Sequence, residues 1–190
     1  TWTIKSIAPS LDLGSDMLVC DADKYTITAQ LSSDATIKWD DNSTNKTRTV
    51  SLVPGVNRFS AKATAKDGSV TCGDISDEII IYNLKATVED VREFVCKYTD
   101  PVHLKGNMVS GDNLQVKGYW TVNGQATIDE PNSPETEANI NGTGTVTFTW
   151  HLEAEFTDPV TGKKMNCSST ATTNSVTKRQ IEIEANEVCT

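Results

Sequence analysis

Five cysteines are the residues of this 190-residue chain that are best suited to chemistry. They stand at Cys20, Cys72, Cys96, Cys167 and Cys189. None shows the CxxC spacing of zinc sites or thioredoxin-like sites. We therefore expect disulfide bonds, which form and persist in oxidising compartments.

The elements that position these cysteines repeat along the chain at a period of about 90 residues, as in tandem β-sandwich modules. The first copy is carried by Trp39 and Cys72, and the second by Trp120, Trp150 and Cys167. A chain of 190 residues fits two domains of about 100 residues each. We expect domains at 1–84 and 85–190, with further modules possible in a longer parent chain.

The modules suggest a pairing of Cys20 with Cys72 and of Cys96 with Cys167. Each pair brackets one module and would cross its two sheets, as immunoglobulin-like bridges do. Each such bond contributes about 4 kcal/mol on the chain-entropy estimate. Cys189 is then left over: it is the first cysteine of another module, a bridge to a neighbouring chain, or a free terminal thiol.

Period-two runs dominate the sequence and predict strands, for example at 25–29, 36–39, 58–63 and 78–82. Turn residues separate them, and Asp158–Lys163 reads as a hairpin connection. Only 88–94 could be helical, and there we expect a strand entry with a loop. The predicted fold class is all-β, with two tandem immunoglobulin-like β-sandwiches.

Aromatic side chains in the alternating strands are expected to form the cores, packed against disulfides. They are Trp39, Trp120, Phe148 and Trp150. Phe148 and Trp150 share a face, which would serve as a glycan-stacking platform only if it were exposed. Trp2 lies near the terminus, where it packs on a preceding module or marks a contact surface.

Composition excludes several partner classes. Asp and Glu outnumber Lys and Arg by 26 to 17, for a formal charge of −9, which repels nucleic acids and anionic lipids. No apolar run is long enough to span a bilayer, so we expect no membrane insertion. The first residues show neither an initiator Met nor a signal segment, and we expect a chain that is processed or cut from a longer one.

The segment 118–128 and the loop 131–136 resemble the PKD-like domains of Bacteroidota surface proteins. The shared features are the Trp120 strand, an Asn-Ser-Pro loop, the spacing of Gly144, Phe148 and Trp150, and the late Cys167. The first module matches more weakly, at 38–40, 52–59 and 77–81. Two departures are the missing acidic-Gly opening and a long insertion from Glu153 to Met165.

This resemblance implies a non-enzymatic structural or adhesive segment of a cell-surface adhesin or filament, in arrays exported by the type IX route, as in gliding-motility adhesins. The partners would be neighbouring modules of the same or identical chains and a glycan or protein ligand of unknown identity. One alternative is a virion fibre or capsid-decorating protein of a phage infecting Bacteroidota. Another is a carbohydrate-binding accessory module of a secreted hydrolase.

Catalytic and metal-binding patterns are weak. His103 and His151 stand far apart, without a Ser-His-Asp order, an HExxH motif or paired carboxylates, and we expect no enzyme and no cofactor. Structural Ca²⁺ is the one ion considered, because it binds loop carboxylates in extracellular sandwiches. The candidate ligands are Asp40, Asp41, Asp74, Asp77 and Glu78, together with Glu89 and Asp90. Solvated loop charge is the simpler interpretation.

Sequons at Asn42, Asn45, Asn141 and Asn166 would indicate glycosylation in a eukaryotic secreted protein and carry no such meaning in a bacterial one.

Overall fold

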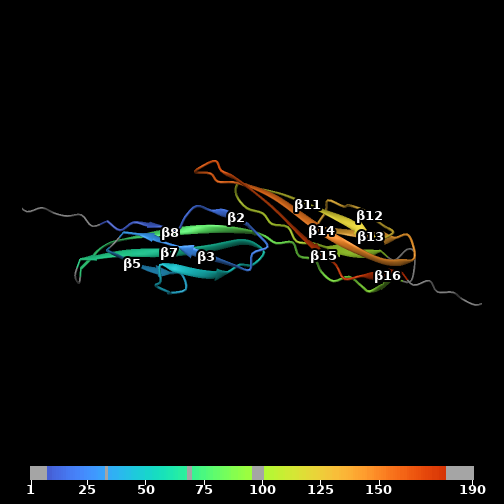
Figure 1. Ribbon diagram of the computed structural model, residues 1–190, viewed down its shortest axis with the longest axis horizontal. Helices are drawn as coiled ribbons and strands as arrows, with labels where there is room; N and C mark the ends of the chain where they lie inside the picture. Colours follow the sequence, from blue (N-terminus) through green and yellow to red (C-terminus); the bar gives the residue numbers. More distant parts are fainter. Residues whose placement is uncertain (1–7, 33, 68–69, 96–100, 179–190) are drawn as a thin grey trace, which may run out of the picture. The chain divides into compact units, whose positions relative to one another are not determined.

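The computed structural model describes residues 8–32, 34–67, 70–95 and 101–178. Every regular element within these residues is a β-strand (Figure 1). The described part of the chain accordingly contains no helix that could cross a membrane. The predicted all-β fold class is confirmed.

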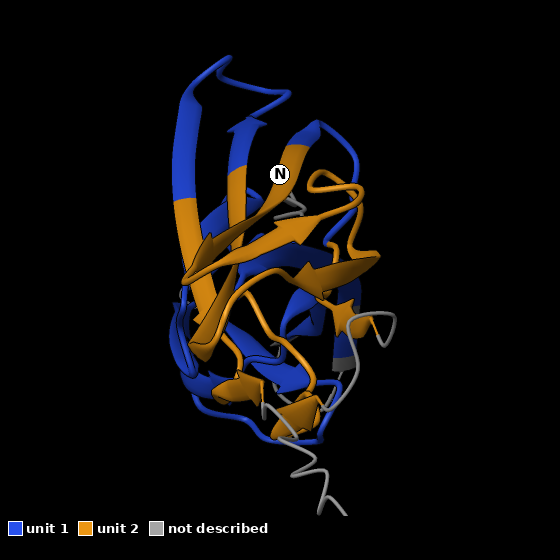
Figure 2. Cartoon of the chain, turned by 90° about the vertical axis from the view of Figure 1, so that its right-hand side faces the viewer, with its two compact units in different colours: residues 1–85, 109–115, 154–167 blue, residues 86–108, 116–153, 168–190 orange. Residues whose placement is uncertain are grey.

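The chain forms two compact units, and neither is a single stretch of sequence (Figure 2). Unit 1 comprises residues 1–85, 109–115 and 154–167, and unit 2 comprises residues 86–108, 116–153 and 168–190. Three strands, β11, β14 and β15, change colour along their length in Figure 2 because part of each belongs to unit 1. The limits 1–84 and 85–190 remain a prediction about the domains.

Unit 1 contains a four-stranded sheet with the order β2-β8-β7-β5 and two pairs, β3-β6 and β1-β4. The strands of its first segment are β1 (Leu11–Asp12), β2 (Met17–Cys20), β3 (Lys24–Thr28), β4 (Gln30–Leu31), β5 (Ala35–Trp39), β6 (Thr47–Ser51), β7 (Gly55–Asp67) and β8 (Val70–Leu84). Strand β2 runs parallel to its neighbour β8. The other strand pairs of the unit are antiparallel.

The core of unit 1 follows from the two-residue period of these strands. Trp39 on β5 lies opposite Ala61 on β7, and Ile37 lies opposite Ala63. All four side chains are buried, whereas Lys38 between them is exposed. The small alanines leave room for the indole ring, so one row of β7 accommodates the bulkiest residue of the core.

Unit 2 holds a three-stranded sheet with the order β10-β13-β12 and strands of a second sheet with the order β11-β14-β16-β9. The remaining strands are β9 (Phe94–Val95), β10 (Val102–Lys105), β11 (Leu114–Asn123), β12 (Ala126–Ile128), β13 (Glu135–Ile140), β14 (Gly144–Thr157), β15 (Lys164–Thr172) and β16 (Val176–Lys178). Strand β15 also pairs with β14. Here too an early strand of the unit, β9, is parallel to a late one, β16.

The core of unit 2 is built around Trp150. Its ring lies 5.0 Å from the ring of Trp120 and covers the backbone of two glycines. A Cβ on Gly106 would stand 2.7 Å from Cγ of Trp150, and one on Gly118 would overlap the far edge of the indole. Glycine is therefore required at both positions, because any side chain would occupy the space of the ring.

Both units share the strand pairing of immunoglobulin-like sandwiches. In that class, with the strands lettered A to G in chain order, B pairs with E, and C, F and G form the other sheet. In unit 1 the B–E pair is β3-β6 and the C–F–G set is β5-β7-β8. In unit 2 the B–E pair is β10-β13 and the C–F–G set is β11-β14-β16. The predicted tandem sandwich is thereby confirmed. The segment 88–94 is not helical: it makes one bridge, Val88 to Gly106, and then enters β9.

Candidate functional site: a long-range disulfide in unit 1

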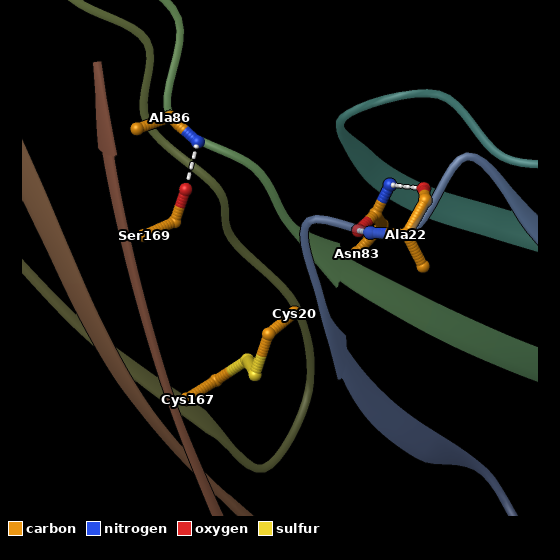
Figure 3. The surroundings of a disulfide bond; sticks show 6 residues. All are labelled: Cys20, Ala22, Asn83, Ala86, Cys167 and Ser169. Atoms are coloured by element: carbon orange, nitrogen blue, oxygen red, sulfur yellow. Dashed lines mark hydrogen bonds between the residues drawn. A yellow bond between two sulfur atoms is a disulfide. The ribbon is translucent and has the colours of Figure 1, made fainter.

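A disulfide joins Cys20, the last residue of β2, to Cys167 in β15 (Figure 3). Both residues belong to unit 1, although they are separated by 147 positions in sequence. Their Cα atoms are 5.7 Å apart, inside the usual range for disulfides. Cys20 is exposed, whereas Cys167 is only 7 % exposed.

The predicted pairings, Cys20 with Cys72 and Cys96 with Cys167, are wrong. The parallel register of β2 and β8 places Cys20 opposite Leu84, which is 84 − 72 = 12 residues beyond Cys72 on the same strand. At about 3.3 Å per residue this separates them by about 40 Å, far beyond disulfide reach. Cys167 is bonded to Cys20 and so is not available to Cys96.

Four of the predicted site residues lie wholly or partly outside the described part of the structure. The backbone of Cys72 lies in β8, but its side chain is outside the described part of the structure. Cys96 and Cys189 lie outside the described residues altogether, as does Trp2. The predicted roles of Cys189 and Trp2 in contacts with neighbouring modules therefore stay predictions.

The backbone just after Cys20 is held by the side chain of Asn83, which is fully buried. Its Nδ2 donates to the carbonyl of Ala22 at 2.7 Å, and its Oδ1 accepts the amide of Ala22 at 3.2 Å (Figure 3). The amide of Asp21, a residue with φ of 47°, donates to the carbonyl of Leu84 at 3.1 Å. These bonds fix the turn that follows β2 and with it the direction of the Cys20 side chain.

Cys167 is positioned by the hairpin of β14 and β15. The predicted hairpin connection Asp158–Lys163 is confirmed, and the buried carboxylate of Asp158 organises it. Its Oδ2 accepts the hydroxyl of Thr161 at 2.6 Å and its Oδ1 accepts the amide of Val160 at 2.9 Å. These hydrogen bonds, the hydroxyl first, lower the pKa of Asp158 below its ordinary value. The loop is thus held by a carboxylate that stays ionised.

A pair of aromatic rings accompanies the disulfide in unit 1. Tyr82 at the end of β8 and Phe156 at the end of β14 have ring centroids 5.3 Å apart, and both are nearly inaccessible to solvent. Gly111 packs its backbone on Tyr82, where a Cβ would overlap the ring. Burial, followed by the nearby charges of Asp16 and Asp112, raises the pKa of Tyr82. Sequence reasoning missed this contact. Phe156 lies in the segment Glu153–Met165, whose extra length was the signal for this contact. In sequence that segment reads as an insertion in the second module.

The proposed Ca²⁺ ligands in unit 1 each have a protein partner. Asp40 and Asp41 both contact the guanidinium of Arg48, and Asp74 contacts Lys62. Glu78 binds Arg58 at 2.9 Å, and Asp77 accepts the amide of Leu13 at 2.8 Å. Bonds from Ser43 lower the pKa of Asp41. In the described residues, no three or more His, Cys, Asp or Glu side chains gather as a metal site would require.

Glu89 and Asp90 line an open surface groove of about 410 Å³ in unit 2, together with His103, Lys105, Glu135 and Glu137. Lys105 binds Glu89 at 2.9 Å, and this carboxylate raises the pKa of the lysine. His103 is exposed and lies 3.4 Å from Glu137. The groove is therefore a network of solvated ion pairs.

His151 lies on the outer side of β14, with its ring stacked on Tyr119 at 4.7 Å and an interplanar angle of 4°. Its Nε2 is 2.8 Å from the hydroxyl of Thr121. Glu153 accepts the hydroxyl of Tyr119 at 3.3 Å, and partial burial followed by this carboxylate raises the pKa of the phenol. The two histidines are not brought together, because His103 lies on β10 and His151 on β14.

The four predicted core aromatics lie inside the units. Trp39 is 2 % exposed, Trp120 3 %, and Phe148 and Trp150 0 %. Each of the three indole N–H groups donates to a backbone carbonyl, at 2.8 to 3.0 Å. The face shared by Phe148 and Trp150 is buried, so the glycan-stacking platform considered for it is absent.

No protein-family model matches the chain, and no curated protein sequence matches it. Among solved structures, the EC1-2 segment of human mucin-like protocadherin matches at a TM-score of 0.33 and 9 % identity, over 92 % of this chain and 99 % of that one. The fibronectin(III)-like modules of Clostridium thermocellum CbhA match at a TM-score of 0.29 and 13 % identity, over 90 % and 95 %. At these scores the likeness carries no argument, and the fold class rests on the strand pairing.

Proposed function

We propose that this chain is a non-enzymatic structural or adhesive segment of a bacterial cell-surface adhesin or filament, in which a disulfide locks unit 1. The observation that carries the proposal is the bond between Cys20 and Cys167. A structural disulfide requires an oxidising environment, such as the cell surface or the extracellular space. The bond therefore supports an exported protein.

The sandwich units suit such a role because their outward faces are polar and well paired. The hydroxyls of Thr26 and Thr49 are 2.9 Å apart across β3 and β6, and those of Thr149 and Thr172 are 2.9 Å apart across β14 and β15. Cross-strand threonine pairs stabilise a sheet without exposing apolar surface. A fold of this class supports many functions, so the argument rests on the disulfide and not on the fold alone.

The alternatives find less support. A virion protein is assembled in a reducing cytoplasm, where a bond that closes most of the chain could not be maintained. A carbohydrate-binding accessory module needs an exposed planar aromatic strip, and the Phe148–Trp150 face is buried. The finer assignment to a Bacteroidota adhesin of the type IX route rests on the motif resemblance. The roles of Trp2 and Cys189 in contacts with neighbouring modules belong to the same proposal.

Immunogold electron microscopy of the native source tests the proposal, with antibody against this segment on intact cells and on shed particles. We expect label on fibres or on the outer envelope of unpermeabilised cells. Label confined to virions would favour the phage protein, and label only after permeabilisation would contradict export. Peptide mapping without reductant, on protein collected from the cell surface, should recover the peptides of Cys20 and Cys167 as one cross-linked species.

A further inference from the structure

The bond between Cys20 and Cys167 closes most of the chain into a covalent loop of 147 residue steps. Tension that enters the chain before Cys20 and leaves after Cys167 passes through the two sulfur atoms. The backbone from 21 to 166 then carries no load. We propose that this disulfide is a redox-gated tether, which sets how far the segment extends under force.

The proposal deepens the proposed function, because a surface adhesin or filament is a setting in which a chain is pulled from both ends. The path of the force, however, depends only on covalent connectivity and on the bond between these two residues. It is independent of how the two units are arranged.

The length held back by the bond is large. A fully extended backbone spans about 3.3–3.6 Å per residue, so 147 steps correspond to about 500 Å of stored length. The chain of 190 residues has 189 steps, and 189 − 147 = 42 lie outside the loop. These correspond to about 150 Å. The oxidised segment is thus limited to roughly a quarter of the extension available to the reduced one.

The bond divides the strands into those outside the loop and those inside it. Strand β1 precedes Cys20 and β2 ends at it, while the end of β15 and all of β16 follow Cys167. Of the described strands, only these can be peeled away while the bond is intact. The strands from β3 to β14, which supply most of the buried side chains of both units, lie inside the loop. The cores are therefore shielded from load in the oxidised protein.

Exposure favours a reductive switch at one end of the bond. Cys20 is exposed and Cys167 is largely buried, so an external thiolate reaches the sulfur of Cys20 first. Attack by one thiolate of an external dithiol forms a mixed disulfide at Cys20 and releases Cys167 as a thiolate. The second thiolate of the dithiol then displaces Cys20. The dithiol leaves as a cyclic disulfide, and its two electrons remain on the two cysteines.

Single-molecule force spectroscopy on the full chain, held by handles at both ends, tests the tether. Without reductant we expect the fully stretched segment to measure at most about 150 Å from end to end. With dithiothreitol we expect about 650 Å. The cysteines other than this pair do not alter these limits, since any further bond only shortens the first value and is also reduced. Equal extension with and without dithiol would overturn the proposal.

The matched control is a double variant with Cys20→Ser and Cys167→Ser. It should extend well beyond about 150 Å before any dithiol is added. If it stays within that limit, another bond holds the chain and the proposal is wrong. Should the variant fail to fold, the wild-type comparison still decides, because it changes only the redox state. The result is independent of cellular location. A virion origin would refute the proposed function but would leave the proposal of a tether standing.

Discussion

The ring of Phe156 packs against the ring of Tyr82 at 5.3 Å with a tilt of 40°, so the tip of the β14–β15 hairpin belongs to unit 1. Tyr82 also contacts the backbone of Gly111. One tyrosine at the end of β8 thus gathers the three separate stretches of sequence that make up this unit.

Truncation of this ring should destabilise unit 1. We expect Phe156→Ala to lower its free energy of unfolding by about 3–5 kcal/mol, the usual cost of removing a buried aromatic ring and leaving a cavity. Urea denaturation followed by near-ultraviolet circular dichroism measures the change. Val160→Ala on the same hairpin is the control: this residue is 86 % exposed and should shift stability by less than about 0.5 kcal/mol. Equal effects of the two variants would contradict the packing.

A second prediction concerns the glycines beneath Trp150. In Gly118→Ala the new methyl group would overlap the indole and lie 3.1 Å from Sδ of Met108. We expect a loss of about 1–3 kcal/mol from overpacking, seen as a lower midpoint in thermal unfolding. Lys117→Ala, at the exposed neighbouring position, should leave the midpoint nearly unchanged. An alanine at 118 without cost would mean that the ring does not cover this strand.

Arg48 provides a third test, since its guanidinium contacts Asp40 and lies 5.4 Å from the centre of the Trp39 ring. Lysine cannot reproduce a planar group that both stacks and binds two carboxylates. We expect Arg48→Lys to cost about 1–2 kcal/mol. Arg58→Lys is the matched control, because Arg58 forms an exposed pair with Glu78 that contributes little. Chemical denaturation of the two variants, side by side, gives the difference.

The pH dependence of stability should reflect Asp158. Its pKa is lowered in the folded state, so its contribution is present above the unfolded value of about 3.9 and is lost as pH falls through the folded value. Asp158→Asn should therefore be less stable at neutral pH, with a difference from wild type that narrows below about pH 4. Unfolding curves between pH 7 and pH 2.5 measure this. A profile for Asp158→Asn that runs parallel to that of the wild type over this range would contradict the role of the carboxylate.

Sequence patterns predicted the fold because strand faces have a short, local signal. The alternation at Glu78–Tyr82 appears in β8, and the turn at Asp158–Lys163 appears as the hairpin loop. The disulfide pairing has no such signal. It depends on which end of β8 lies beside β2, and this register is set by tertiary packing between distant residues. A cysteine that brackets a module in sequence need not face its neighbour in space.

The hairpin tip illustrates the same limit. Its alternating residues correctly indicate two long strands, but alternation cannot say which unit their ends join. Phe156 looks like any inward residue of the second module and instead contacts Tyr82. Asn83 was also missed, because an asparagine in a strand gives no indication that both ends of its amide bind Ala22.

The composition of unit 1 also sets an order of events when the protein is made. The apolar cluster of its sandwich comes from residues between Leu11 and Ile81, and these are available early in synthesis. Phe156 and Cys167 emerge more than seventy residues after Tyr82 and Cys20. A nascent or partly exported chain therefore carries an unpaired thiol at Cys20 until the 147 positions up to Cys167 have followed it. Oxidation before residue 167 arrives would trap it with an earlier cysteine, so unit 1 depends on a late oxidation to reach its final form.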